Sequence, residues 1–436
     1  MRRLRAAAAA LATATAAFAA AAPAPPATAA GTAGKPLPSQ DPFYSYDGST
    51  PLADIAPGTV LEQRSVDVSL GANTTPVPAV QLLYRTQDER RHPSVTVTTV
   101  LTPSSGVSVP RLVAYLSFYD ALGPECDPSY TLTGGYAGTD ANEQQAEAEE
   151  AIISSYLSEG DIVTVPDFEG THLHWAAGQE SGWNTLDSIR ATESALGLDA
   201  GTPVGMTGYS GGSIAAEWAS ELAPGYSPEL TIAGVAAGGV PVHFAHNLHY
   251  VNGSQVWSGV IPAVLVAAGR AFGVHLRHYL SAKGRHITHQ VRHECIGSFN
   301  GAYPGLRIQD LLRHRYRHFL KVRRFVLVVN HLIMGRTEGH PAGPLFLAVG
   351  NGDGTGDGVM VAADVEGLAH EYCQQGVPLH FAEYSGDSHT QAAIPFEQTA
   401  LQFLQERLTG VPFTDDNCAS VGKGNSLAPV PVPPRH

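Results

Sequence analysis

The stretch Val204–Ala216, VGMTGYSGGSIAA, carries the pattern around which the rest of the chain can be interpreted. It holds the only G-x-S-x-G of the sequence, with Ser210 at its centre. An apolar strand-like run (Val204–Thr207) precedes the serine, and small and apolar residues typical of a helix follow it (Ser213–Leu222). A serine on such a strand–turn–helix connection is exposed at the strand end, beside helix N–H groups that can hold an oxyanion. We therefore predict that Ser210 is a nucleophile, although this short pattern also arises by chance in a chain with 46 glycines.

Two predicted partners of this serine lie downstream of it. A serine hydroxyl is a weak nucleophile until a histidine accepts its proton and a carboxylate orients that histidine. The apolar run Leu345–Val349 leads into a glycine-rich loop that contains Asp353 and Asp357. We favour Asp357 because an apolar run and a predicted helix follow it almost directly, and Asp353 remains the alternative acid. The later run Leu379–Tyr384 leads to His389, the predicted base, in a polar loop before the last predicted helix.

The charge that forms on an attacked carbonyl oxygen needs hydrogen-bond donors beside the serine. The amide of Gly211, directly after the serine, is the first predicted donor. The second is expected from the loop after the strand-like run Arg111–Ser117, where position alone makes Asp120, Tyr119 and Ala121 the candidates.

Other polar residues have a less specific pattern. Asp167 and Glu169 follow the strand-like run Ile162–Pro166, where they either face the rim of the pocket or cap nearby helices. Several histidines have partial metal-ligand spacing but lack an acidic ligand at the expected offset, which favours solvated or hydrogen-bonded histidines over zinc. These residues are His172, His174, and His286, His289 and His293 with Cys295. We expect no metal and no cofactor.

Predicted strands and helices alternate along most of the chain. This alternation predicts an α/β fold with a mostly parallel sheet covered by helices on both faces. Strands are expected at 80–84 and 94–101 as a hairpin, and at 111–117, 162–166, 204–207, 230–236, 345–349 and 379–384; helices are expected at 143–158, 185–198, 362–375 and 394–409.

The ends of the chain indicate export. A basic start followed by an alanine-rich apolar run predicts a secretory signal peptide over residues 1–30, so the protein is expected to be extracellular or associated with the cell envelope. No later stretch is apolar for long enough to span a bilayer. We expect a disordered leader at 31–40, a first core segment at 41–242, a second at 337–420, and a proline-rich tail at 421–436.

Residues 243–336 break the α/β alternation and differ in charge. They show long helical patterns, with 13 lysines and arginines against two acids, whereas the rest of the chain carries 13 against 38. A basic helical insertion after the strand that follows the nucleophile predicts a cap or lid. Its basic face either suits anionic lipid surfaces and carboxylate-releasing substrates, or is an ordinary solvated face.

The four cysteines are Cys126, Cys295, Cys373 and Cys418. An even number in an exported chain predicts two disulfides rather than four reduced thiols. Three pairings are possible, and we favour Cys126–Cys295 with Cys373–Cys418, because the second pair would tie the C-terminal tail to a late helix.

Several motifs in the same order resemble the secretory lipases, the fungal lipase A-type α/β-hydrolases that also occur in actinobacteria. Together they span nearly all of the expected mature chain. They are DPFYSYD (41–47), LVAYLSFYDALGPECDPSY (112–130), VPDFEG (165–170), LDSIRA (186–191), GYSGG (208–212), GDGVM (356–360) and GDSHT (386–390).

The resemblance implies an α/β-hydrolase fold with Ser210, Asp357 and His389 as a triad and Asp120 and Gly211 at the oxyanion hole. It also implies a helical cap and cofactor-free hydrolysis of carboxylic esters and acylglycerols. The run Arg313–Arg324, RHRYRHFLKVRR, is more basic than the family leads one to expect.

The sequence thus predicts a secreted serine carboxylester hydrolase or lipase that forms an acyl-enzyme intermediate. Its expected partner is a lipid or small ester, with lipid-interface contact through the basic cap and no nucleic acid. The alternatives are an acyltransferase with the same triad and a non-catalytic lipid- or surface-binding protein on a hydrolase scaffold.

Overall fold

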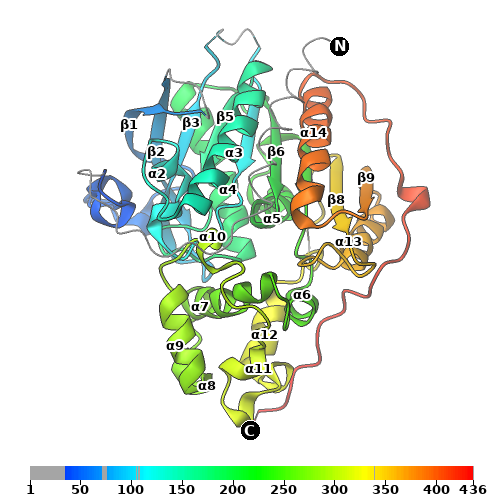
Figure 1. Cartoon of the computed structure of the whole chain (residues 1–436). Coiled ribbons are helices and arrows are strands. Elements are labelled where there is room, and N and C mark those ends of the chain that lie inside the picture. The colour runs from blue at the N-terminus through cyan, green and yellow to red at the C-terminus, as the bar shows by residue number, and fades with distance from the viewer. Residues whose placement is uncertain (1–34, 71–75, 105, 107–108, 338, 436) are drawn as a thin grey trace.

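The computed structural model describes residues 35–70, 76–104, 106, 109–337 and 339–435 (Figure 1). The expected signal peptide, residues 1–30, lies outside the described residues. Residues 35–40, which we expected in a disordered leader, instead include a short 3-10 helix, Pro38–Gln40, whose Pro38 is buried.

Nine strands of the described chain form one sheet in the order β1-β2-β3-β5-β4-β6-β7-β8-β9. Strands β1 to β3 and the β3–β5 pair are antiparallel, and every later pair is parallel. The carboxyl ends of the parallel strands meet at one edge of the sheet, so the loops after β4, β6, β8 and β9 lie together there. The strands are β1 (Val60–Val68), β2 (Val77–Gln87), β3 (Pro93–Leu101), β4 (Leu112–Leu116), β5 (Ile162–Pro166), β6 (Pro203–Tyr209), β7 (Thr231–Gly238), β8 (Leu345–Asn351) and β9 (Leu379–Ser385).

Helices cover both faces of this sheet, as the alternation of elements predicts. Successive strand residues point to opposite faces. In β4, Leu112, Ala114 and Leu116 pack in one buried cluster, while Val113 and Tyr115 pack in another. The first cluster includes residues of α4, α5 and α13, and the second includes residues of α3 and α14. These helices are α3 (Asp140–Ser158), α4 (Gly178–Leu196), α5 (Gly211–Tyr226), α13 (Ala362–Gln374) and α14 (His389–Leu408).

The predicted hairpin and the strands β4 to β9 are confirmed, but some boundaries differ. The sequence did not reveal β1, an edge strand whose polar residues are mostly exposed. Helix α4 begins at Gly178, earlier than the expected Thr185. Its small residues look like a loop in the sequence, but Gly178 packs against Trp218 and Gly182 against Ala219 of α5. A side chain larger than hydrogen at these positions would push the two helices apart.

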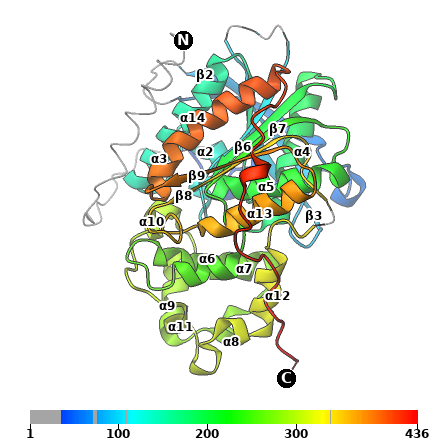
Figure 2. The ribbon, with the colours of Figure 1, turned by 90° about the vertical axis from the view of Figure 1, so that its right-hand side faces the viewer.

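Between β7 and β8 the chain leaves the sheet and forms a group of helices at one end of the molecule (Figures 1 and 2). No strand of residues 243–336 joins the sheet. Helices α8, α9 and α11 lie farthest from the sheet in both views. The helices of this group are α6 (Phe244–Tyr250), α7 (Val260–Phe272), α8 (Leu276–Tyr279), α9 (Ala282–Val291), α10 (Ile296–Phe299), α11 (Ile308–Leu311) and α12 (Arg323–His331).

The C-terminal segment runs from α14 back along the core to these helices (Figure 2). Disulfide Cys373–Cys418 anchors its start to α13. The side chain of Asn330 in α12 exchanges two hydrogen bonds with the backbone of Val430, each 2.8 Å long. The second disulfide, Cys126–Cys295, joins the loop after β4 to the turn before α10. The structure thus has the cysteine pairing that we favoured. No helix of the described residues is long and apolar enough to cross a bilayer.

Candidate active site

Ser210 lies on the sharp turn between β6 and α5. Its backbone has φ 53° and ψ −119°, a strained conformation for a residue other than glycine. A Cβ at Gly208 would meet the backbone of Gly212, and a Cβ at Gly212 would meet the carbonyl oxygen of Leu116. The two glycines therefore let the helix pass close to β6 and β4, which places the serine at the end of the helix axis.

Three predicted residues from three separate segments of the chain meet at this turn. The Nε2 atom of His389 lies 2.8 Å from Ser210 Oγ, and its Nδ1 atom lies 2.7 Å from Asp357 Oδ2. All three residues are buried, with Ser210 the most exposed at 9%. In this arrangement the imidazole can accept the serine proton at Nε2 while Nδ1–H donates to the carboxylate.

The structure distinguishes between the two candidate acids. The backbone amides of Val359 and Met360 donate to Asp357 Oδ1 at 3.0 and 2.7 Å, which orients the other oxygen toward the imidazole. Asp353 is exposed and accepts hydrogen bonds from the amides of Thr355 and Gly356 within its own turn. Only Asp357 therefore contacts the histidine.

His389 is the first residue of α14, not part of a loop ahead of a helix that begins at Ile394 as we expected. A capping box formed by Ser388 and Gln391 begins the helix earlier, and Pro395 lies inside it. The Tyr209 hydroxyl donates to the backbone carbonyl of His389 at 2.5 Å.

Trp257 is a further neighbour of the imidazole that the sequence did not reveal. Its ring contacts the ring of His389 edge-on, with the centroids 5.2 Å apart. Trp257 precedes α7 by only a few residues, so the helices outside the sheet also shape the site.

Asp120, from the loop after β4, lies against Gly211. A Cβ at Gly211 would collide with Asp120 Oδ1, and the same oxygen accepts a hydrogen bond from Trp175 Nε1 at 2.7 Å. Asp120 has φ 40°, a left-handed conformation that is uncommon for residues other than glycine. Burial raises the pKa of its carboxyl group to about 7, while the Trp175 hydrogen bond lowers it.

The remaining candidates for the second oxyanion donor form hydrogen bonds with other residues. The amide of Ala121 donates to both carboxylate oxygens of Glu169, at 3.1 and 3.3 Å. The Tyr119 hydroxyl accepts a hydrogen bond from the amide of Glu169. Asp167 accepts from the amide and hydroxyl of Ser129 in the short helix Pro128–Thr131, as a helix-capping residue would. Glu169 and Asp167 therefore organise the loops behind the site.

Two apolar cavities extend from Ser210 into the helical insertion. The first has a volume of about 60 Å³ and is lined by Ser210, Asp120, Asn247 and apolar side chains. The second, of about 40 Å³, lies between α6, α7 and α12 and has an almost entirely apolar lining. The two share the residues Trp175, Ala176, Phe244, Leu248 and Val264. A larger, more polar cavity near residues 38–45 is lined by Asp167 but not by Ser210 or His389.

The model of the secretory lipase family matches residues 137–416, well over half of the chain. The chain belongs to the secretory lipase family. A secreted triacylglycerol lipase of Malassezia restricta is 30% identical over 387 residues, covering 86% of this chain and 81% of that protein. A Mycobacterium tuberculosis protein named "Probable inactive lipase" is 30% identical over 389 residues, covering 87% and 84%.

Solved structures agree with this family and with the α/β-hydrolase fold. Candida antarctica lipase A has a TM-score of 0.80 at 28% identity, with 88% of this chain and 89% of that chain covered. The rice cell wall degrading esterase LipA of Xanthomonas oryzae has a TM-score of 0.60 at 14% identity, with 81% and 99% covered, and shares the fold. This secretory lipase is accordingly a carboxylic ester hydrolase.

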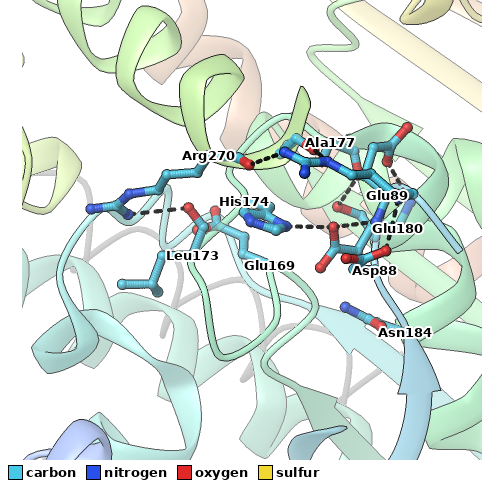
Figure 3. A network of polar contacts seen from close by, with 12 residues as sticks. Asp88, Glu89, Glu169, Leu173, His174, Ala177, Glu180, Asn184 and Arg270 are labelled. Carbon is cyan, nitrogen blue, oxygen red and sulfur yellow. Dashed lines mark hydrogen bonds and ion pairs between the residues drawn. The ribbon is translucent and has the colours of Figure 1, made fainter. Parts of the chain in front are cut away.

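In this secretory lipase, Arg270 of α7 holds the loops on which Asp120 and Trp175 lie. Its guanidinium donates to the carbonyl of Leu173 at 3.3 Å (Figure 3). It also donates to the carbonyl of Leu122 at 3.1 Å. Leu122 follows Asp120 by two residues, and Leu173 precedes Trp175 by two. The helical insertion is thus bonded to both loops that shape the Gly211 side of the site.

A second contact region between the insertion and the core contains two buried glutamates (Figure 3). Glu89 and Glu180 each accept a hydrogen bond from the other's backbone amide, at 2.9 and 2.8 Å. His331 of α12 contacts Glu89 at 2.7 Å, and His174 contacts Glu180 at 2.7 Å. Burial lowers the pKa of His174 to about 4, so this histidine is neutral and hydrogen-bonded at neutral pH.

Proposed function

We propose that this secretory lipase cleaves lipid acyl esters through Ser210, His389 and Asp357. The observation that carries the proposal is the pair of contacts at 2.8 and 2.7 Å that joins these residues in one relay. Residues 41–242 and 337–420 would form the hydrolase core and residues 243–336 its cap. The expected signal peptide and the secreted relatives support an extracellular location.

The mechanism begins with attack of Ser210 Oγ on the ester carbonyl while His389 Nε2 takes the hydroxyl proton. Asp357 stabilises the imidazolium through the hydrogen bond at Nδ1. The new oxyanion is held by the amide of Gly211 and by the Asp120 loop. His389 then protonates the departing alcohol, which leaves an acyl-serine. Water, activated by the same imidazole, attacks that acyl group and regenerates the free serine.

Two features of Asp120 support its place at the oxyanion. Its carboxyl group lies directly against Gly211, and burial raises its pKa to about 7. Below that pH the neutral acid can donate a proton to an oxyanion, whereas the ionised form would repel it. Trp175 holds Oδ1 by its indole N–H and leaves Oδ2 as the donor.

The two connected apolar cavities fit the acyl chain of the substrate. Their linings bring almost no polar group toward a chain that extends from Ser210 toward α12. Burying methylene groups there would stabilise bound long-chain esters relative to short ones. This favours a lipid ester over a small polar ester.

Two alternative functions predict different behaviour toward esters. An acyltransferase would use the same acyl-serine but pass the acyl group to an alcohol faster than to water. A non-catalytic lipid-binding protein would hold esters without cleaving them; the Mycobacterium tuberculosis relative is named a probable inactive lipase. The intact Ser210–His389–Asp357 contacts favour catalysis in this chain.

Turnover of p-nitrophenyl butyrate and decanoate by the wild type and by Ser210→Ala tests the proposal. We expect the variant to lose activity by about three or more orders of magnitude on both esters, because no other group replaces the nucleophile. Full activity of the variant would refute the assignment. A folded wild type that turned over neither ester would support the binding protein, and faster acyl transfer to added alcohol would support the acyltransferase.

A further inference from the structure

Residues 275–291 and 306–324 form the end of the cap farthest from the sheet, and we name them the basic tip (Figures 1 and 2). They contain ten lysines and arginines and a single acid, Asp310. The whole chain nevertheless has a formal net charge of −14. The molecule is therefore strongly polarised, with its positive charge concentrated at one end.

The charges of the basic tip point to solvent and are largely uncompensated. Lys283 lies 3.9 Å from Asp310 in the only ion pair within the tip, all of whose residues are described. The hydrogen-bond acceptors recorded for the other cationic side chains are backbone carbonyls, as for Arg313 with Leu280 and Arg277. Nine of the ten cationic residues are exposed: Arg277, Lys283, Arg285, Arg307, Arg313, Arg315, Arg317, Lys321 and Arg324.

The same short segments line the second apolar cavity on their inner side. Leu276 and Ile308 line this cavity, and their sequence neighbours Arg277 and Arg307 are exposed. Phe319 also lines it, between the exposed Arg317 and Lys321. The exposed cations and the side chains that line the cavity therefore lie on opposite sides of the same short segments.

We propose that the basic tip binds lipid surfaces that carry anionic headgroups and so brings the acyl cavities to their substrate. The inference rests on the proposed lipid esterase function. A basic side chain near an anionic membrane strengthens binding about fivefold, and the acidic remainder of the chain is repelled by the same surface. Attraction and repulsion together orient the molecule with the tip toward the lipid.

A soluble polyanion has the same charge complementarity, but the cavity beneath the tip favours a lipid. A free polyanion has no apolar chain to place between α7 and α12. A lipid layer presents both the headgroup charge and the acyl chains within a few ångströms of each other.

Sedimentation with vesicles tests the proposal on the Ser210→Ala protein, which would leave the lipid intact. Vesicles of phosphatidylcholine alone are compared with vesicles that also contain phosphatidylglycerol, at low and at high salt. We expect binding to the anionic vesicles at low salt and its loss near ~1 M salt, where screening shortens the range of surface charges to about 3 Å.

Two double substitutions in that protein locate the binding surface. Arg317→Gln with Lys321→Gln removes two exposed tip charges and is expected to weaken partition to anionic vesicles about 25-fold. Arg91→Gln with Lys423→Gln makes the same charge change at exposed positions outside the basic tip and is expected to alter partition less than about twofold.

Equal binding to neutral and anionic vesicles, or equal weakening by both doubles, would overturn the proposal. Binding to soluble polyphosphate but not to vesicles would also overturn it. Turnover of soluble p-nitrophenyl butyrate by proteins with Ser210 intact separates this result from the proposed function. If turnover is retained but vesicles are not bound, only the proposal for the basic tip is refuted. If vesicles are bound but the ester is not cleaved, the proposed chemistry is refuted.

Discussion

Val264 lies where the two apolar cavities meet, so enlarging its side chain should shorten the acyl chain that the site accepts. It is one of the five residues that line both cavities, and it projects from the middle of α7. The substitution Val264→Phe adds a ring at this junction. It should leave the cavity of about 60 Å³ beside Ser210 available and close the passage to the cavity of about 40 Å³ beyond.

The expected magnitude follows from these volumes. Roughly half of the apolar space lies beyond Val264, so a decanoyl chain would lose contacts for about four methylene groups. At about 0.8 kcal/mol for each buried methylene, transition-state binding falls by ~3 kcal/mol, which corresponds to ~200-fold in kcat/KM. This is an upper estimate, because a displaced chain retains part of its contacts. The butyrate ester should change by less than about twofold, since its chain ends before the junction.

The assay is kcat/KM for p-nitrophenyl butyrate, hexanoate, octanoate and decanoate. The matched control is Val256→Phe, the same change at a residue that is 52% exposed and lines neither cavity. In the wild type and in this control, kcat/KM should rise about fourfold for each added methylene until the cavities are full. A Val264→Phe profile parallel to that of the wild type, or an equal loss on all four esters, would refute the acyl-cavity assignment.

Two further predictions concern Asp120 and the C-terminal disulfide. Burial raises the pKa of Asp120 to about 7, so its carboxyl group is neutral below that pH and ionised above it. The activity that depends on this proton is therefore present at lower pH. Above pH 7 it falls about tenfold for each pH unit. Asp120→Asn keeps a neutral donor at every pH, so its profile should lack this alkaline limb, and an unchanged limb would show that Asp120 does not donate to the oxyanion. Replacing both Cys373 and Cys418 by serine opens a loop of 45 residues, which should lower the free energy of unfolding by about 4 kcal/mol, measured by urea denaturation. A loss below about 1 kcal/mol would mean that the tail contacts at Val430 hold this segment without the disulfide.

Local chemistry made much of the core predictable. Buried parallel strands are short continuous apolar runs, which is why β5 and β8 could be found in the sequence. Chain order then placed Asp357 and His389 after successive strands, at the same sheet edge as Ser210. The sequence alone does not distinguish Asp353 from Asp357, because both lie in one glycine-rich loop. Only the structure distinguishes them, because backbone amides orient the two side chains in different directions.

Other features depend on contacts between segments that are far apart in the chain. Trp175 and Trp257 have no motif, yet one holds Asp120 and the other lies against His389. The start of α4 was missed because its glycines serve helix–helix packing, which is not visible in local propensity.

The sequence by itself determined the order in which Ser210, Asp357 and His389 follow their strands, the parallel core and the unusual charge of the insertion, whereas the cysteine pairing came from the structure. These properties depend on residue type and on spacing along the chain. Local backbone preferences and hydrophobic periodicity determine helices and strands directly from such patterns. Only the tertiary structure decided that the insertion turns its apolar side chains toward Ser210 and its cations toward solvent. The physical reason is that a short irregular helix can bury any of its faces, and packing against α6, α7 and the Trp175 loop selects which one.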